Sequence, residues 1–254
     1  MSTATRLLIV VRTYPDLSTK YDETVCTAAI DETGEWLRLY PVPLRYLADD
    51  QRYRVGSIVR ANLANNPNDD RPESRKPDLI SLHVESDRTS VEARHDWIEA
   101  GKTFASLDEL KAAGRSIGPV AVSEVLEFRA EPQSPDWSPK EQQILSQEML
   151  HTQRLDLEKI PFKFRVRWRD AEGVEQLNTF RSWEVCQTWR NWNRLYGSDE
   201  AVPRMRQKWL QEVWPQGRDV RFFLGNLADP RKRGVFHLTG SHSAPKDAHE
   251  ATLF

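Results

Sequence analysis

Apolar and polar positions follow strand-like patterns through much of the first half of the chain. Residues 7–11 form a short apolar run of the kind that enters a core sheet, and residues 24–30 are apolar or β-branched at almost every position. A run without alternation is typical of a strand buried on both faces. Residues 36–40 follow a short turn and predict the second strand of a hairpin. Pro41 and Pro43 lack a backbone donor, so we expect pairing to stop there.

The rest of the first half predicts further short elements around this hairpin. Residues 62–78 are polar and hold three prolines, which predicts a long loop. The remaining periodicities predict strands at 55–61, 79–85 and 117–130 and helices at 88–100 and 107–113. Together these elements indicate an N-terminal, barrel-like antiparallel β-domain over residues 1–133.

The second half combines a strongly alternating strand with aromatic helices. Residues 162–169 alternate between apolar and basic side chains. Residues 183–196 place Val185, Trp189, Trp192 and Tyr196 on one face of an amphipathic helix. The remaining patterns predict helices at 138–150 and 203–213 and strands at 220–224 and 234–239. We therefore expect a smaller mixed α/β domain with Trp-rich helices over residues 134–239, a disordered tail over 240–254, and an α+β fold class.

Composition places the chain among globular proteins. Of its 254 residues, 39% are apolar and 29% are charged, and no apolar run approaches the ~18 residues of a membrane span. The apolar run near the N-terminus is too short for a signal peptide. Cys26 and Cys186 stand far apart in apolar contexts, as buried thiols do in a reducing compartment. We expect a cytoplasmic location and no membrane partner.

The distribution of charge points to an anionic partner. Residues 162–238 hold 15 Lys and Arg against 9 Asp and Glu, whereas residues 1–161 hold 20 against 27. Within this basic segment, the period of two puts Lys163, Arg165, Arg167 and Arg169 on one face of one strand. Like charges so close repel, so the face must be solvated, paired with acids, or matched to an anionic ligand. It is the strongest sequence-based candidate for contact with a nucleic-acid backbone.

Three further groups of basic and aromatic residues extend this hypothesis. Arg231, Lys232 and Arg233 form a basic loop between the last two predicted strands. Arg38 and Tyr40 are placed where the hairpin ends, at the rim of a possible groove. The polar loop contributes Arg71 and Arg75, which either bind an anion or pair with acids of the same loop.

Enzymatic and scaffolding functions stay open as alternatives. A metal-dependent nuclease or a base- or nucleotide-modifying hydrolase would have to be built from Asp69, Asp70, Glu73, His83 and His237, which are separated in the sequence. The spacing of residues shows no zinc motif, no phosphate-binding glycine loop and no Ser-His-Asp set, so no cofactor or metal is expected. Alternatively, the Trp-rich half packs against a partner protein in a larger complex.

Several motifs carry a resemblance over most of the chain. The RLYPVP end of the hairpin, the RPES sequence at 71–74, the KIPFKFRVRW strand and the FFLGN…GVF ending resemble an uncharacterised family of prokaryotic hypothetical proteins. That resemblance implies no activity. The order of the N-terminal strands is also loosely similar to the PUA-like β-barrels, which read RNA or modified bases. The terminal Leu253 and Phe254 resemble the peptides that dock DNA-processing proteins onto the bacterial sliding clamp.

These observations favour a protein that binds DNA or RNA, in DNA processing or in defence against mobile elements.

Overall fold

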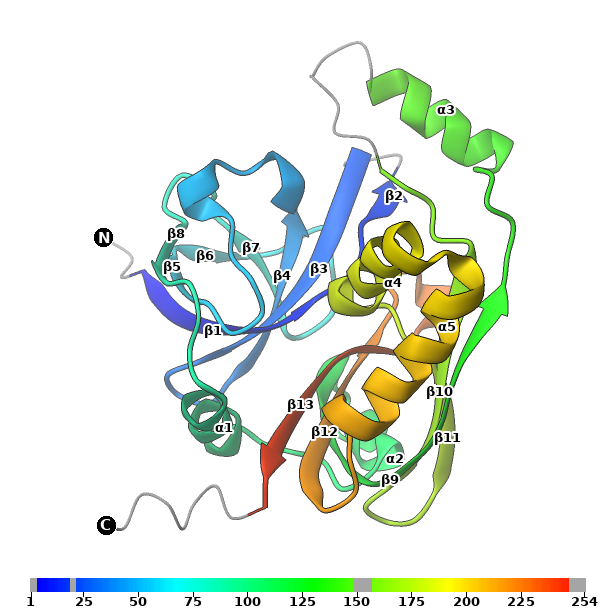
Figure 1. Ribbon diagram of the computed structural model, residues 1–254. Helices are drawn as coiled ribbons and strands as arrows, with labels where there is room; N and C mark the ends of the chain where they lie inside the picture. Colours follow the sequence, from blue (N-terminus) through cyan, green and yellow to red (C-terminus); the bar gives the residue numbers. More distant parts are fainter. Residues whose placement is uncertain (1–3, 19–21, 149–156, 247–254) are drawn as a thin grey trace.

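A computed structural model describes residues 4–18, 22–148 and 157–246, which form two β-sheets flanked by helices (Figure 1). Strands from the first part of the chain build one sheet, and strands from the second part build the other. The first sheet is made of β1 (Thr5–Arg12), β2 (Asp16–Ser18), β3 (Asp22–Asp31), β4 (Trp36–Val42), β5 (Ile58–Ala61), β6 (Leu63–Asn65), β7 (Ser74–Pro77) and β8 (His83–Ser86). The second is made of β9 (Ile117–Pro132), β10 (Phe162–Asp170), β11 (Glu175–Thr179), β12 (Arg218–Asn226) and β13 (Phe236–Pro245).

The first sheet is curled and mostly antiparallel. Its strand order is β6-β7-β4-β3-β1-β5-β8, with β2 paired to β3, and the one parallel pair is β4 with β7. Two predictions from the sequence are wrong: that strand pairing stops at Pro41, and that residues 62–78 form a loop. Pairing passes through Pro41, because Val42 still pairs with Val25 across an irregular register. The predicted polar loop at 62–78 contains β6 and β7, because a strand can pair through its backbone even when its side chains are polar.

The predicted burial of residues 24–30 on both faces is confirmed, and the neighbouring strand β1 is buried in the same way. Leu7, Ile9 and Ala29 belong to the core of the first sheet. Leu8 and Ile30 belong to a separate cluster that also includes Phe223 of β12. β1 and β3 therefore lie between the core of their own sheet and the junction with the second sheet, which explains their nearly uninterrupted apolar sequence.

The second sheet is antiparallel, with the order β11-β10-β9-β12-β13. Its two edges approach each other where Phe180, just after β11, forms a bridge with Leu238 of β13. β9 is its central strand, so the sheets divide the chain between β8 and β9. The sequence-based domain boundary near residue 133 lies at the far end of β9.

Helices cover one side of the second sheet and connect the two sheets. They are α1 (Val91–Ala100), α2 (Leu107–Ala112), α3 (Pro139–Glu148), α4 (Trp183–Tyr196) and α5 (Ser198–Gln207), the last continued by a π-helical turn, Lys208–Val213. Short 3₁₀ turns lie at Leu44–Tyr46, Asp49–Gln51 and Pro230–Lys232. The side chains of Ser90, Ser106 and Ser182 accept backbone hydrogen bonds at the starts of α1, α2 and α4. In Figure 1, α4 and α5 lie over the second sheet, while α3 projects from the main body.

The tryptophans of α4 and the following turn are largely core residues. Trp189 and Trp209 are buried with Val185 and Met205 in the core of the second sheet. Tyr196 was expected on the buried face, but it is 46% exposed because α4 ends there, at Gly197. The predicted helix at 203–213 begins earlier, at Ser198, so Pro203 lies inside it. In the described part of the chain, no helix combines the length and apolar character needed to cross a bilayer.

Candidate functional site

A cleft with two adjoining hollows lies where the two sheets meet. The first hollow has a volume of about 420 Å³ and takes its walls from β3, β4, α3 and the segment after β12. The second has a volume of about 500 Å³ and is walled by β10 and the segments on either side of α3. Arg181, Leu227 and His237 line both hollows, so the two form one continuous cleft. These volumes lie within the range of about 300–1,000 Å³ typical of ligand sites.

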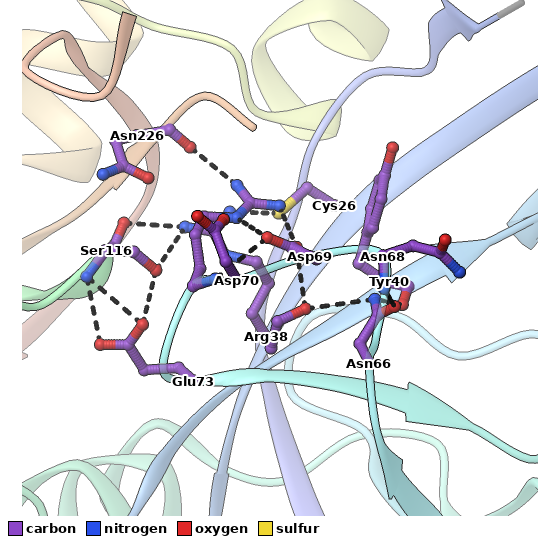
Figure 2. A network of polar contacts seen from close by, with 12 residues as sticks. Cys26, Arg38, Tyr40, Asn66, Asn68, Asp69, Asp70, Glu73, Ser116 and Asn226 are labelled. Carbon is purple, nitrogen blue, oxygen red and sulfur yellow. Dashed lines mark hydrogen bonds and ion pairs between the residues drawn. The ribbon is translucent and has the colours of Figure 1, made fainter. Parts of the chain in front are cut away.

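The floor of the first hollow holds a buried guanidinium, that of Arg38 on β4 (Figure 2). Its side chain donates hydrogen bonds to Cys26 Sγ at 2.8 Å and to the Ser116 carbonyl at 2.8 Å. Only 2% of the residue is exposed, and burial lowers the pKa of the guanidinium. Among the described residues no carboxylate lies within ion-pair distance of it, and its Nε has no hydrogen-bond partner. A buried charge without a counter-ion is costly, which is a reason to look for a ligand.

Arg71 lines the same hollow as Arg38 and has a counter-ion, Asp69. Its guanidinium donates to both Asp69 oxygens, at 2.7 and 2.5 Å, and to the Asn226 carbonyl at 3.0 Å. Burial alone would raise the pKa of Asp69, but the hydrogen bonds and charge of Arg71 outweigh it, and the net shift is downward. Ser74 donates a further hydrogen bond to Asp69 at 2.8 Å. Arg71 thus ties the 62–78 segment to the end of β12 and also adds positive charge to the cleft.

The acids that a nuclease would need do not meet in the cleft. Glu73 is fully buried and accepts hydrogen bonds from the backbone N–H of Ser116 at 3.1 Å and from its hydroxyl at 2.5 Å. Asp70 pairs with Arg233, and Asp69 is held by Arg71. His83 lies exposed on β8, the far edge of the first sheet. Each acid therefore has a structural partner, and among these candidates only His237 lines the cleft.

His237 is a neutral, partly buried side chain at the junction of the two hollows. Desolvation, together with the charges of Arg181, Lys163 and Arg165, lowers its pKa to about 4. Its Nδ1 is buried and has no hydrogen-bond partner among the described residues. At neutral pH it therefore offers hydrogen bonding without charge.

The rim of the cleft carries three exposed lysines that come from separate elements. Lys140 on α3 and Lys232 line the first hollow, and Lys163 on β10 lines the second. Within the described residues, none of these three ammonium groups makes a hydrogen bond or an ion pair. Asp229 and Glu141 are the acids among the lining residues, and both have basic partners, Arg231 and Lys159. The cleft is therefore strongly basic.

The basic face of β10 is different, because acids neutralise it. The predicted alternation is confirmed, with Phe164, Val166 and Trp168 buried on the opposite face. Arg165 pairs with Glu131, Arg167 with Glu127 and Glu175, and Arg169 with Glu124 and Glu175. All four acids lie on the neighbouring strands β9 and β11. Of the basic quartet, Lys163 is the member that makes no ion pair with a described residue, and it is also the member that lines the cleft.

The other predicted residues divide between the cleft and the surface. Tyr40 lines the first hollow, with the Arg71 guanidinium 5.7 Å from its ring centroid. Arg231 and Arg233 pair with Asp229 and Asp70. Arg75 donates to the carbonyls of Pro72 and Ser74 and is not among the lining residues. Leu253 and Phe254 lie outside the described residues.

A second polar cluster lies away from the cleft, between α1 and strands β12 and β13. His95 Nε2 and one oxygen each of Glu99 and Asp219 lie within 4.8 Å of one another, a donor set that can hold a divalent cation. Arg221, however, contacts both carboxylates, at 2.9 Å for Asp219. A guanidinium therefore already supplies the positive charge. His242 Nε2 lies 3.3 Å from His95 Nδ1 and completes the cluster.

Family models cover the chain in two parts. The model for a domain of unknown function, DUF8758, matches residues 3–101, and that for another, DUF8757, matches residues 100–254. The second match covers more than half of the chain, so the chain belongs to the DUF8757 family. This agrees with the expectation of an uncharacterised family. The two matches meet at the end of α1, in the interval between the strands of the first sheet and those of the second.

Other comparisons add little. No curated protein matches the chain. Among solved structures, it is similar to one described as "Structure of murine DNA binding protein bound with ds DNA", with 9% identity, 96% of each chain covered and a TM-score of 0.31. A likeness at that score carries no argument about fold or function.

Proposed function

We propose that this protein binds nucleic acid through the cleft between its two sheets. The observation that carries the proposal is the Arg38 guanidinium, which is buried at the floor of the cleft without a carboxylate partner among the described residues. Its desolvation is unfavourable, and an anionic ligand would offset that cost. The ammonium groups of Lys140, Lys163 and Lys232, which have no partner in the described part of the chain, extend the positive charge to the rim.

The cleft also offers what nucleic acid requires beyond charge. A polyanion is attracted by several cations spaced along a groove, and its bases pack against aromatic rings. Tyr40 lines the first hollow, and Tyr14, Trp137 and Phe162 line the second. Binding therefore takes place in the cleft and not on the outer face of β10, where acids pair with the arginines. The cellular setting that we propose, DNA processing or defence against mobile elements, rests on the sequence alone.

The test is direct binding across a salt series. Fluorescence anisotropy with labelled single- and double-stranded DNA and RNA should show binding that weakens linearly with the logarithm of salt concentration. The Lys140→Gln/Lys163→Gln/Lys232→Gln variant should bind more weakly and with a shallower salt dependence. Absence of binding to all four ligands at low salt would refute the proposal.

A further inference from the structure

The two hollows of the cleft differ in chemistry, and that difference indicates which form of nucleic acid enters. The first hollow is lined by Arg38, Arg71, Lys140 and Lys232 and suits a phosphate. The second combines the rings of Tyr14, Trp137 and Phe162 with charged side chains, among them Lys159 and Lys163, and suits a flat aromatic ring beside an anionic group. A ligand that fills both hollows must carry an anionic group and an aromatic group close together, as a nucleotide does.

Three aromatic side chains of the second hollow are only partly buried, those of Tyr14, Trp137 and Phe162. Trp137 lies just before α3, and the Lys159 ammonium lies 5.3 Å from the centroid of its ring. Phe162 begins β10 and is braced by Trp189, with ring centroids 5.9 Å apart. A braced ring is a low-entropy stacking surface for a base. His237, whose Nδ1 has no hydrogen-bond partner among the residues that the structure describes, lines both hollows and so lies between this surface and the basic hollow.

The size of the cleft selects against a duplex. Hollows of about 420 and 500 Å³ can take a nucleotide each, but they cannot admit two paired strands. In a duplex each base is stacked and paired, so its ring cannot reach the second hollow while its phosphate lies in the first. A single strand has bases that turn away from the backbone freely.

From this we infer that the cleft binds single-stranded nucleic acid in preference to duplex, with an unpaired base against Trp137 and Phe162 and the adjoining phosphate in the basic hollow. The inference rests on the proposed function and specifies its ligand. Charge attracts every form of nucleic acid, whereas the aromatic hollow supplies the preference for the single strand.

The experiment compares a labelled 12-nucleotide single strand, as DNA and as RNA, with its blunt duplex at 0.1 M salt. The single strand should bind at least tenfold more tightly than the duplex. Trp137→Leu and Phe162→Leu should each weaken single-strand binding roughly tenfold, the effect of losing one stacked base, while the salt dependence stays unchanged. Trp137→Phe keeps a ring and should restore most of the affinity.

Tyr196→Leu is the matched control, because Tyr196 is 46% exposed and is not among the residues that line the cleft. Its binding should equal that of the parent chain, and thermal unfolding of each variant establishes that it is folded. Equal affinity for single strand and duplex, or loss of both to the same extent in Trp137→Leu, would overturn the inference. In either case, if the Lys140→Gln/Lys163→Gln/Lys232→Gln variant still bound more weakly and with a shallower salt dependence than the parent chain, the proposed function would stand without the preference for a single strand. No binding of any strand at low salt would overturn both.

Discussion

Replacing the three rim lysines with glutamine should remove a defined part of the salt dependence of binding. For a single strand, log K falls with log salt by about 0.7 for each phosphate neutralised. Three lost contacts should therefore make the slope shallower by about 2. At 0.1 M salt this corresponds to a loss of affinity of about a hundredfold, or roughly 2.7 kcal/mol, and the difference should vanish near 1 M salt.

The control is the triple substitution Arg165→Gln/Arg167→Gln/Arg169→Gln. It changes the net charge by the same amount, so a general effect of charge would appear equally in both variants. These arginines pair with acids of β9 and β11, and exposed pairs of this kind contribute at most about 1 kcal/mol each. We expect the slope to change by less than about one unit.

The assay is fluorescence anisotropy from 0.05 to 1 M salt on all three proteins, each shown to be folded by thermal unfolding. A slope that becomes shallower in the arginine variant, with the lysine variant unchanged, would refute the reasoning. It would return the binding surface to the outer face of β10.

Three further predictions follow from buried groups. Arg38→Met should weaken binding at least tenfold. Because a desolvated charge is removed, the free energy of unfolding should stay within about 1 kcal/mol of the parent value or rise. A loss of more than about 2 kcal/mol in urea unfolding would show that Arg38 has a structural role. Desolvation, with nearby positive charge, lowers the pKa of His242 to about 3, so between pH 6.5 and 3 the unfolded chain takes up a proton that the folded chain does not. The free energy of unfolding should fall as the pH is lowered, by about 1.6 kcal/mol from pH 6.5 to 5, and His242→Gln should lose correspondingly less in unfolding measured at both pH values. Gly34 has φ 83°, and an added Cβ would collide with the Ala100 carbonyl. Gly34→Ala should therefore lower the free energy of unfolding in urea by at least about 2 kcal/mol. Gly173→Ala, where φ is nearly the same but the surrounding space is open, should lower it clearly less. Equal costs for the two glycine variants would contradict the close approach.

Side-chain periodicity predicted most of the strands, because it depends only on which faces are buried. Two bounds were wrong: the strand expected at 79–85 begins only at His83, and residues 240–245, expected in a disordered tail, belong to β13. The 24–30 run and the 162–169 alternation both appear as expected. The prediction of a loop at 62–78 was wrong, because β6 and β7 pair through backbone atoms, and this pairing leaves no signal in the sequence. The pairing of β9 within the second sheet depends on long-range register, which a single sequence does not specify.

The candidate site was only partly predictable for the same reason. The four basic residues of β10 share a face as predicted, but Glu124, Glu127 and Glu175 oppose them only once the register is known. The cleft draws residues from nine separate segments, including Lys140, Trp137 and Arg181, which no local motif marks. Arg38 was expected at the rim and lies at the floor, because the second sheet packs over the end of the hairpin.

Photocrosslinking tests the central claim most directly. The protein would be mixed with a 12-nucleotide strand that contains 4-thiouracil, and the complex would be irradiated. The crosslinked residues would then be identified by mass spectrometry. The proposed site predicts crosslinks at residues that line the cleft, above all Trp137, Phe162 and Tyr40. Crosslinks confined to the outer face of the second sheet, for example at the exposed Leu177 of β11, would contradict it.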